Sequence, residues 1–485
     1  MDLELSTLDA TAQAELVRTG DLTPLELVDA AINRIEKVNG ELNAVIHPLF
    51  DSARAVADTA ADGPFRGVPI VIKDLDGALA GAPLHMGNKL LKRVGYMADH
   101  DSYLFTQLRD AGFVIVGKTN TPELGLMPTT EPEAYGPSRN PWSTAHGTGG
   151  SSGGTAAAVA SGMVPLGHAG DGGGSIRIPS SACGLFGLKP TRGRVSLGPE
   201  IGEAWAGLVQ RHVLTRTVRD SAAVLDVLTG PMPGDPYYAP PPVRPFLNEV
   251  GAEPGALRIG VRTTAPAAMA ETDPACVAAA EGAARLLESL GHHVEEAAPA
   301  ALDETELLGL FLAILTTHVV WDIRHLEAMT NTTVTPDDVE PLTWLYYEQG
   351  LEVTAIQYLE AVNAAHAWSR RVAQWWQSAD GRAGFDLFLT PTMAEPPPQI
   401  GDVVGTKDNP WNGMARATAF ATYAAPFNVT GQPAMSVPLG HEPANGLPVG
   451  VQLVAPYARE DMLLRVAGQL EAARPWAPRR PPVHA

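Results

Sequence analysis

The sequence predicts an α/β fold. Short apolar runs of the kind that form buried strands alternate with helical patterns, as at residues 68–72, 104–109 and 113–116. The composition is that of an ordinary globular protein, with 45% hydrophobic and 18% charged residues. At 485 residues, the chain is long enough to bury the core of one large or two medium domains.

Residues 1–65 are predicted to form an N-terminal helical flank. The segment 23–26 (Thr-Pro-Leu-Glu) reads as a capping box with proline at the first helical position, and the Asn-Gly pair at 39–40 supplies a stop signal. Apolar residues between these two signals fall on one face of the helix. We therefore expect that face to pack on a neighbouring element.

Residues 66–230 are predicted to form a core that carries the chemistry. Its first apolar strand ends at Lys73. A helix of small residues over 155–160 is followed by a strand over 163–169, which leads the chain to Asp171. Polar residues at strand ends are well placed to build a site.

Residues 231–256 are rich in proline and read as a stiff connector, and 257–485 complete the same α/β domain. Within that second part, 303–378 are strongly helical and carry five tryptophans, so we expect an insertion that shapes a pocket. A loop rich in Gly, Asn and Pro is expected over 396–415. The remaining strands and helices are predicted at 257–261, 273–290, 385–389, 448–454 and 461–472.

The formal net charge of −20 argues against binding to nucleic acid or anionic membranes, which require basic patches. Two cysteines, Cys183 and Cys276, are too few for a disulfide framework or a zinc cluster, which favours a reducing compartment. The first five residues show no signal-peptide pattern, and no uninterrupted apolar run approaches the roughly 20 residues of a spanning helix. We expect a cytoplasmic protein without metal or cofactor.

The stretch 147–179 holds two serine-bearing glycine runs, at 149–154 and 172–175. Such a density of glycine lets several backbone N–H groups converge on one point, where they can hold developing negative charge. Ser175 directly follows three glycines, so these donors can point at a carbonyl oxygen bound beside its Oγ. Ser151 lies 24 residues upstream, and the helix and strand between them can bring the two serines together.

The base is less obvious. His146 and His168 flank the glycine runs, but a lone histidine is more often a hydrogen-bonded structural residue than a base. A lysine can act as a base only when burial lowers its pKa and leaves it neutral. Lys73 fits this requirement because it follows five apolar strand residues; the alternative is that it merely pairs with adjacent Asp74.

These residues lie in segments that resemble the amidase signature family, in order and over nearly the whole chain. Within that family, residues 43–46, 98–101 and 130–134 look most like the 6-aminohexanoate cyclic-dimer hydrolase branch. A single glycine run would be weak evidence, but the whole set is highly specific. The matching segments are 68–74, 117–125, 139–142, 149–154, 171–179, 187–193, 426–434 and 446–452.

The resemblance implies the amidase signature fold, in which helices cover both faces of a central mixed β-sheet, and a serine hydrolase with a Ser-Ser-Lys triad. Ser175 is similar to the family's acylated nucleophile. Ser151 is similar to the bridging serine, which is held by a cis peptide, and Lys73 is similar to the base. The expected substrate is a small molecule with a linear or cyclic amide bond, and we expect a homodimer.

Further roles are implied around this triad. The oxyanion would be held by the N–H groups of Gly172, Gly173 and Gly174, together with that of the nucleophile. Many family members have a bulkier residue where this chain has Gly172, so the rigidity of the loop comes into question. Gly125 and Leu126 follow a family segment that lines the acyl pocket.

Two possible roles remain for each of three supporting residues. Ser152 either hydrogen-bonds within the site and supports Lys73 or serves only the turn. Asp171 and Arg177 either form an ion pair that braces the nucleophile loop or an exposed pair of little energetic value.

Two other functions share parts of this pattern. The glutaminase-type subunit of a tRNA-dependent amidotransferase has the same three catalytic motifs, and a non-catalytic amide-binding protein could retain the fold. The presence of Lys73, Ser151 and Ser175 together argues against the second. The glycine runs do not indicate nucleotide binding, because the chain has no GxxxxGK[ST] sequence.

Overall fold

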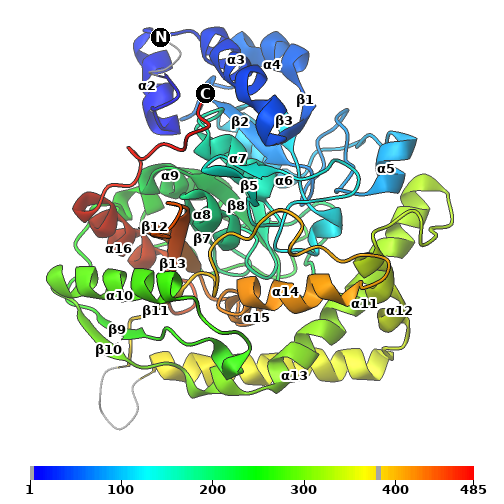
Figure 1. The fold of residues 1–485 in the computed structure, drawn as a ribbon. Helices are drawn as coiled ribbons and strands as arrows, with labels where there is room; N and C mark the ends of the chain where they lie inside the picture. The colour runs from blue at the N-terminus through cyan, green and yellow to red at the C-terminus, as the bar shows by residue number, and fades with distance from the viewer. Residues whose placement is uncertain (1–4, 378–383) are drawn as a thin grey trace.

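The structure, a computed structural model, describes residues 5–377 and 384–485 (Figure 1). Residues 1–4, which carry most of the signal-peptide expectation, and residue 378, the expected end of the helical insertion, lie outside the described residues. The strands are β1 (Val45–Pro48), β2 (Pro69–Lys73), β3 (Val114–Thr119), β4 (Arg139–Asn140), β5 (Ser143–Gly147), β6 (Leu166–Asp171), β7 (Phe186–Lys189), β8 (Gln210–Thr215), β9 (Arg258–Val261), β10 (His293–Glu296), β11 (Leu387–Pro391), β12 (Ala434–His441) and β13 (Pro448–Val454). The α-helices are α2 (Ala10–Thr19), α3 (Pro24–Leu42), α4 (Phe50–Val56), α5 (Lys89–Val94), α6 (Tyr103–Asp110), α7 (Gly153–Ala160), α8 (Arg177–Cys183), α9 (Val218–Leu228), α10 (Pro274–Ser289), α11 (Glu306–Thr330), α12 (Pro341–Leu351), α13 (Ala355–Ala373), α14 (Trp411–Ala421), α15 (Pro426–Val429) and α16 (Glu460–Ala473).

Within the described residues, eleven strands form one mixed sheet in the order β1-β3-β2-β6-β8-β7-β12-β13-β11-β9-β10. β2 runs parallel to both β3 and β6, whereas β6 and β8 are antiparallel. Residues at the carboxyl ends of neighbouring parallel strands meet at the same end of a sheet. Lys73 ends β2 and Asp171 ends β6, so strand pairing alone brings the lysine and the serine-bearing glycine loop together.

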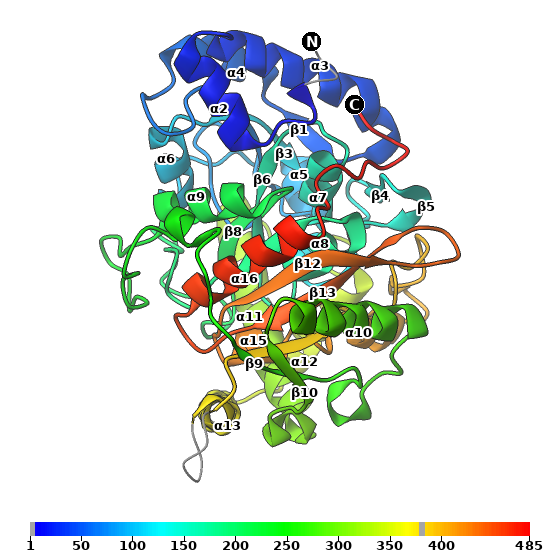
Figure 2. The same ribbon diagram turned by 90° about the vertical axis from the view of Figure 1, so that its left-hand side faces the viewer.

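The sheet is buried on both faces, as a mixed α/β fold requires. Along β2, Ile70 and Ile72 belong to one apolar cluster, which also takes residues from α6, α9, α10 and α16. Val71, which points to the opposite face, belongs to a second cluster with residues from α3, α7, α8 and α11. Figure 2 shows α16 and α10 on the near side of β12 and β13. The predicted fold, with helices on both faces, is confirmed.

The N-terminal segment differs in two details from the helical flank expected over 1–65. The capping box at the start of α3 is present, with Thr23 and Glu26 bonded to each other's backbone. The helix runs past the expected stop at 39–40 and ends at Leu42, and Asn43, which caps it, adopts a left-handed conformation (φ 49°). β1 also lies in this segment and pairs with β3, so residues 1–65 contribute a strand to the central sheet.

Several strands that complete the sheet were not among those predicted. In β8, the buried residues include Gln210, Arg211 and His212, so no apolar run marks the strand. β7, which pairs with β8, is short, and β12, which follows β7 in the sheet, is rich in small residues. The loop expected over 396–415 is wrong from Trp411 onward, because α14 begins there, and the alanines in its second half favour a helix.

The expected helical insertion is formed by α11, α12 and α13, at the end of the molecule opposite α2–α4 (Figure 1). α11 is the one described helix that is long and apolar enough to cross a bilayer, with a mean hydropathy of 1.6 over its most apolar window. Length and composition alone are weak evidence for a membrane span, and α11 packs against α12 and α13. The side chains it leaves uncovered line the cavities described next.

Candidate active site

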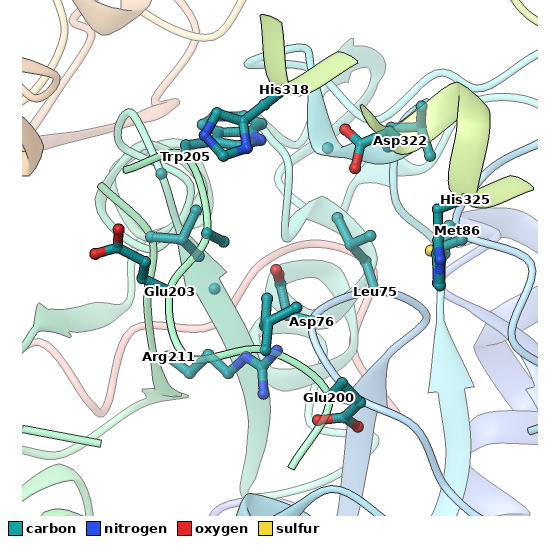
Figure 3. Close-up of a pocket in the computed structure, with 18 of the residues that line it drawn as sticks. Leu75, Asp76, Met86, Glu200, Glu203, Trp205, Arg211, His318, Asp322 and His325 are labelled. Carbon is teal, nitrogen blue, oxygen red and sulfur yellow. The ribbon is translucent and has the colours of Figure 1, made fainter. Parts of the chain in front are cut away.

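A cavity of about 770 Å³ lies at the carboxyl ends of β2 and β6 (Figure 3). Lys73, Ser151 and Ser175 all lie in its wall, although they come from a strand end, the start of a helix and a glycine-rich loop. The structure therefore brings together the three residues that sequence reasoning singled out for catalysis.

Lys73 makes two polar contacts in this wall. Its Nζ donates to Ser151 Oγ and to Asp76 Oδ2, both at 2.8 Å, and the lysine side chain is 1% exposed. Adjacent Asp74 instead pairs with Lys118, at 2.7 Å. The alternative in which Lys73 only pairs with Asp74 is wrong, and sequence reasoning missed Asp76.

Asp76 is a carboxylate held between two cations. Burial by itself raises the pKa of Asp76, but the charges of Lys73 and Arg211 outweigh burial and keep that pKa below its ordinary value. Burial in turn lowers the pKa of Arg211, against the opposing charge of Asp76. The carboxylate thus anchors the Lys73 amine while another N–H of that amine is directed at Ser151.

Ser151 follows a cis peptide bond with Gly150, as the family resemblance implies. Its neighbour Ser152 occupies the position before α7, but the Ser152 side chain makes no capping hydrogen bond to that helix. Ser152 Oγ donates to the carbonyl oxygen of Gly170, at 3.2 Å. Ser152 therefore supports β6, which carries the nucleophile loop, and the expected direct support of Lys73 is wrong.

The loop that follows β6 presents Ser175 to the cavity. Within the described residues, Ser175 Oγ forms no hydrogen bond, and the N–H groups of Gly172, Gly173 and Ser175 donate to no protein atom. The N–H of Gly174 donates to Asp171 Oδ1 at 2.7 Å, so the expected oxyanion donor at Gly174 is already engaged. Three free donors remain beside the serine.

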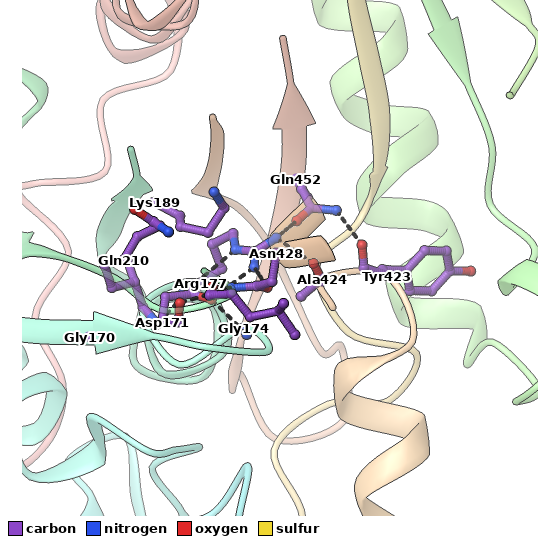
Figure 4. A network of polar contacts seen from close by, with 12 residues as sticks. Gly170, Asp171, Gly174, Arg177, Lys189, Gln210, Tyr423, Ala424, Asn428 and Gln452 are labelled. Carbon is purple, nitrogen blue, oxygen red and sulfur yellow. Dashed lines mark hydrogen bonds and ion pairs between the residues drawn. The ribbon is translucent and has the colours of Figure 1, made fainter. Parts of the chain in front are cut away.

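Asp171 and Arg177 form a buried pair at the base of this loop (Figure 4). Both side chains are 0% exposed, and the guanidinium meets the carboxylate at 2.9 and 3.0 Å. Asp171 also accepts the N–H groups of Gly174 and Ile176, at 2.7 and 3.1 Å. Burial alone raises the pKa of Asp171, but the charge of Arg177 and its hydrogen bonds hold that pKa well below its ordinary value. The reading as an exposed pair of little energetic value is wrong.

Two further residues complete the network in Figure 4, and sequence reasoning gave neither a role. Asn428 accepts from Arg177 at 2.6 Å and donates to Asp171 Oδ1 at 2.8 Å. Gln452 accepts from Arg177, also at 2.6 Å. Both lie in segments that carry the family resemblance, 426–434 and 446–452, which is the signal that could have identified them.

A second cavity, of about 150 Å³, also reaches Ser175. Its wall is mostly apolar and includes Gly125, Leu126 and Phe311, so the two residues expected to line an acyl pocket both lie here. Gly125 has φ 71°, and a Cβ at this position would stand 3.3 Å from Ser151 Oγ and 2.7 Å from Leu75. Only glycine lets this segment approach Ser151 so closely.

Trp205 lines both cavities. A Cβ on Gly172 would stand 2.8 Å from the Trp205 ring and 3.1 Å from Val209. The indole therefore occupies the space that a side chain at Gly172 would take. The nucleophile loop lacks a side chain at Gly172, but the packing of Trp205 and Val209 against this position offsets the expected loss of loop rigidity.

The histidines considered as bases do not line either cavity. His168 is buried in β6, and burial lowers its pKa to about 3. His146 bonds Ser143 Oγ at 2.8 Å in β5. The described residues contain no group of His, Cys, Asp and Glu side chains that could hold a metal ion.

The chain matches known proteins over almost its whole length. A family model described as "Amidase" matches residues 26–464. The 6-aminohexanoate-cyclic-dimer hydrolase of Pseudomonas sp. (strain NK87) is 44% identical over 480 residues, which cover 98% of this chain and 96% of that protein. The enzyme of the same name from Paenarthrobacter ureafaciens is also 44% identical, over 482 residues with the same two shares.

Among solved structures, a 6-aminohexanoate cyclic dimer hydrolase complexed with substrate superposes with a TM-score of 0.95 at 42% identity. The match covers 99% of this chain and 100% of that one. The fold, the site and these relatives define an enzyme that hydrolyses amide bonds. The chain belongs to the amidase family, with the amidase signature fold.

Proposed function

We propose that the protein is a serine amidohydrolase that forms an acyl-enzyme on Ser175, with Ser151 and Lys73 as its proton-transfer pair. The observation that carries the proposal is the 2.8 Å hydrogen bond from Lys73 Nζ to Ser151 Oγ in the wall that also holds Ser175. The unpaired N–H donors beside Ser175 support it further.

The chemistry follows general acid–base logic. As Ser175 Oγ attacks the amide carbonyl, its proton passes to Ser151, whose own proton moves to Lys73. This step requires the neutral amine of Lys73, which forms when the ammonium group that pairs with Asp76 loses one proton to solvent. The N–H groups of Gly172, Gly173 and Ser175 hold the oxyanion. Return of the proton through Ser151 to the amide nitrogen expels the amine, and water then releases the acyl group from Ser175.

The two cavities assign the two halves of the substrate. Ser151 lines the larger cavity, whose wall carries charged side chains, and not the smaller one, and it must protonate the leaving nitrogen. The leaving amine therefore belongs in the larger cavity, and the acyl portion in the smaller, apolar cavity beside Gly125 and Leu126. The names of the relatives make the 6-aminohexanoate cyclic dimer the first substrate to test.

A fluorophosphonate probe, followed by mass spectrometry of tryptic peptides, tests the nucleophile. We expect labelling of Ser175 in the native enzyme and none in Ser175→Ala. Lys73→Ala should slow both labelling and turnover of the cyclic dimer by about 100-fold or more, because the proton has no acceptor. Ser143→Ala, which removes a hydroxyl from β5 outside both cavities, is the matched control. Labelling that persists in Ser175→Ala would exclude the proposed nucleophile.

The proposal includes a cytoplasmic, cofactor-independent enzyme that binds neither nucleic acid nor membrane, in keeping with the net charge of −20. The homodimer stays a prediction. Light scattering coupled to gel filtration tests it directly, since a dimer has twice the 51.1 kDa mass of the chain.

A further inference from the structure

One carboxyl group in the larger cavity has no role in the proposed chemistry. Asp322 lies on α11, between His318 and His325, and Figure 3 shows its carboxyl group pointing into the cavity. Among the described residues it has no hydrogen-bond or ion-pair partner. Asp322 is partly buried in this wall, and burial raises the pKa of its carboxyl group to about 7.

The other carboxylates near Asp322 in this wall are engaged. Asp76 accepts from Lys73 at 2.8 Å, and Glu203 accepts from the hydroxyl of Tyr237 at 2.8 Å. Glu200 accepts from the hydroxyl of Ser102. A partly buried carboxyl group without a partner is unfavourable, and the cost is relieved when a ligand supplies an N–H donor. Asp322 is the carboxyl of this cavity with that capacity.

Resting on the proposed function, we propose that Asp322 is a specificity-determining residue, which binds a second nitrogen donor carried by the leaving amine. The donor is either an ammonium group or an amide N–H, at the far end of the leaving portion from the scissile bond. The substrate class is therefore an amide whose amine half carries a second nitrogen, as in derivatives of diamines and in cyclic or linear oligoamides of amino acids.

The position of Asp322 assigns it to the leaving portion. It lines the cavity that holds Lys73 and Ser151, and it is absent from the apolar cavity that receives the acyl portion. Its neighbours on the same face of α11 are polar or aromatic, including His318, which bonds the hydroxyl of Tyr358 at 3.3 Å. A nitrogen donor placed here meets a carboxyl group without a partner, whereas the other carboxylates of this wall are already hydrogen-bonded.

Three amides with one acyl group and leaving amines of equal length test the proposal. Their far ends carry an ammonium group, an N-acetyl amide or a methyl group. For the native enzyme, kcat/KM should favour the two nitrogen-bearing amides over the methyl analogue by about 10- to 100-fold. Asp322→Asn should abolish the preference for ammonium and leave the methyl analogue unchanged. Glu203→Gln removes the same charge from the same cavity and should keep the preference.

Equal losses on all three amides in Asp322→Asn would overturn the proposal, and so would an unchanged preference. The two nitrogen-bearing arms show whether the donor is a charged amine or a neutral amide. Calorimetric binding of the free amines to Ser175→Ala separates recognition from catalysis. If no amide is hydrolysed, the proposed function fails. Binding still decides the role of Asp322: the ratio of affinities for the nitrogen-bearing and methyl amines, measured on Ser175→Ala, should be lost when Asp322→Asn is added. A ratio that stays unchanged in the double variant would exclude the role of Asp322.

Discussion

The carboxylate that pairs with Lys73 belongs to Asp76, three residues further along the chain, and not to the adjacent Asp74. Successive strand residues point to opposite faces of a sheet, so Asp74 turns away from the cavity and meets Lys118. The chain then reverses through Asp76, which has φ 64°, a left-handed conformation in which aspartate is enriched. This turn returns a carboxylate to the lysine. The pairing follows from backbone geometry and not from adjacency in the sequence.

Gly172 offers a test at this scale. Its missing Cβ leaves room for the ring of Trp205, at 2.8 Å, so Gly172→Ala should displace the ring or the loop and lower kcat/KM by about 10-fold or more. Gly173→Ala is the matched control, because its Cβ would meet only Phe311, at an ordinary 3.6 Å. Combining Gly172→Ala with Trp205→Ala should recover part of the loss in steady-state kinetics. Equal losses for both single variants would contradict a steric origin.

At the scale of elements, the nucleophile loop is fixed by segments distant in sequence. Arg177 begins α8 and reaches Asn428 of α15 and Gln452 of β13, in addition to Asp171 at the end of β6. A buried ion pair is of value only when its remaining hydrogen-bonding capacity is satisfied, and this network satisfies it. The loop that carries Ser175 therefore rests on three elements at once.

Arg177→Lys tests this network. Lysine cannot reproduce the planar fork that contacts Asp171, so the substitution should lower the free energy of unfolding by about 3 kcal/mol and slow acylation of Ser175. Urea denaturation and fluorophosphonate labelling measure the two effects. Arg416→Lys, in a partly exposed pair with Glu395, should change stability by less than about 1 kcal/mol. Similar effects of the two substitutions would refute a special role for the network.

At the scale of the whole molecule, a group of carboxyls joins the N-terminal segment to the C-terminal helix. Asp220 of α9 accepts the N–H groups of Ala10 and Thr11, at 2.6 and 2.9 Å, and burial raises its pKa to about 6. Glu471 of α16 accepts the N–H of Val218, and burial raises its pKa to about 7. A carboxyl whose pKa rises on folding holds its proton better in the folded state, so stability falls as pH increases from about 4.5 to 7.

Glu471→Gln should remove part of this pH dependence. We expect equal free energies of unfolding for variant and native protein near pH 4.5, and about 1–2 kcal/mol in favour of the variant at pH 8. Urea midpoints at the two pH values measure the difference. Glu288→Gln, at an exposed position of α10, should track the native protein at both. A variant that loses stability at pH 8 would show that the Glu471 carboxylate stabilises the fold.

Much of the site could be predicted because its residues lie in local motifs. Lys73, Ser151 and Ser175 were identified from an apolar strand end and two glycine runs, and the structure places all three in one wall. Gly174 was assigned wrongly because its N–H is taken by Asp171, a contact that depends on the loop's closure. β8 was missed because buried polar residues occupy its first three positions, so no hydrophobic period marks the strand.

By itself, the sequence determined the α/β class and the chemical types available for catalysis, since hydrophobic period and glycine density are local properties of the chain. Only the tertiary structure decided the partner of Lys73, the donors left free beside Ser175 and the two cavities that meet there. Each of these depends on side chains from remote segments, such as Asp322 of α11. Their approach is set by packing across the sheet, which no local pattern records.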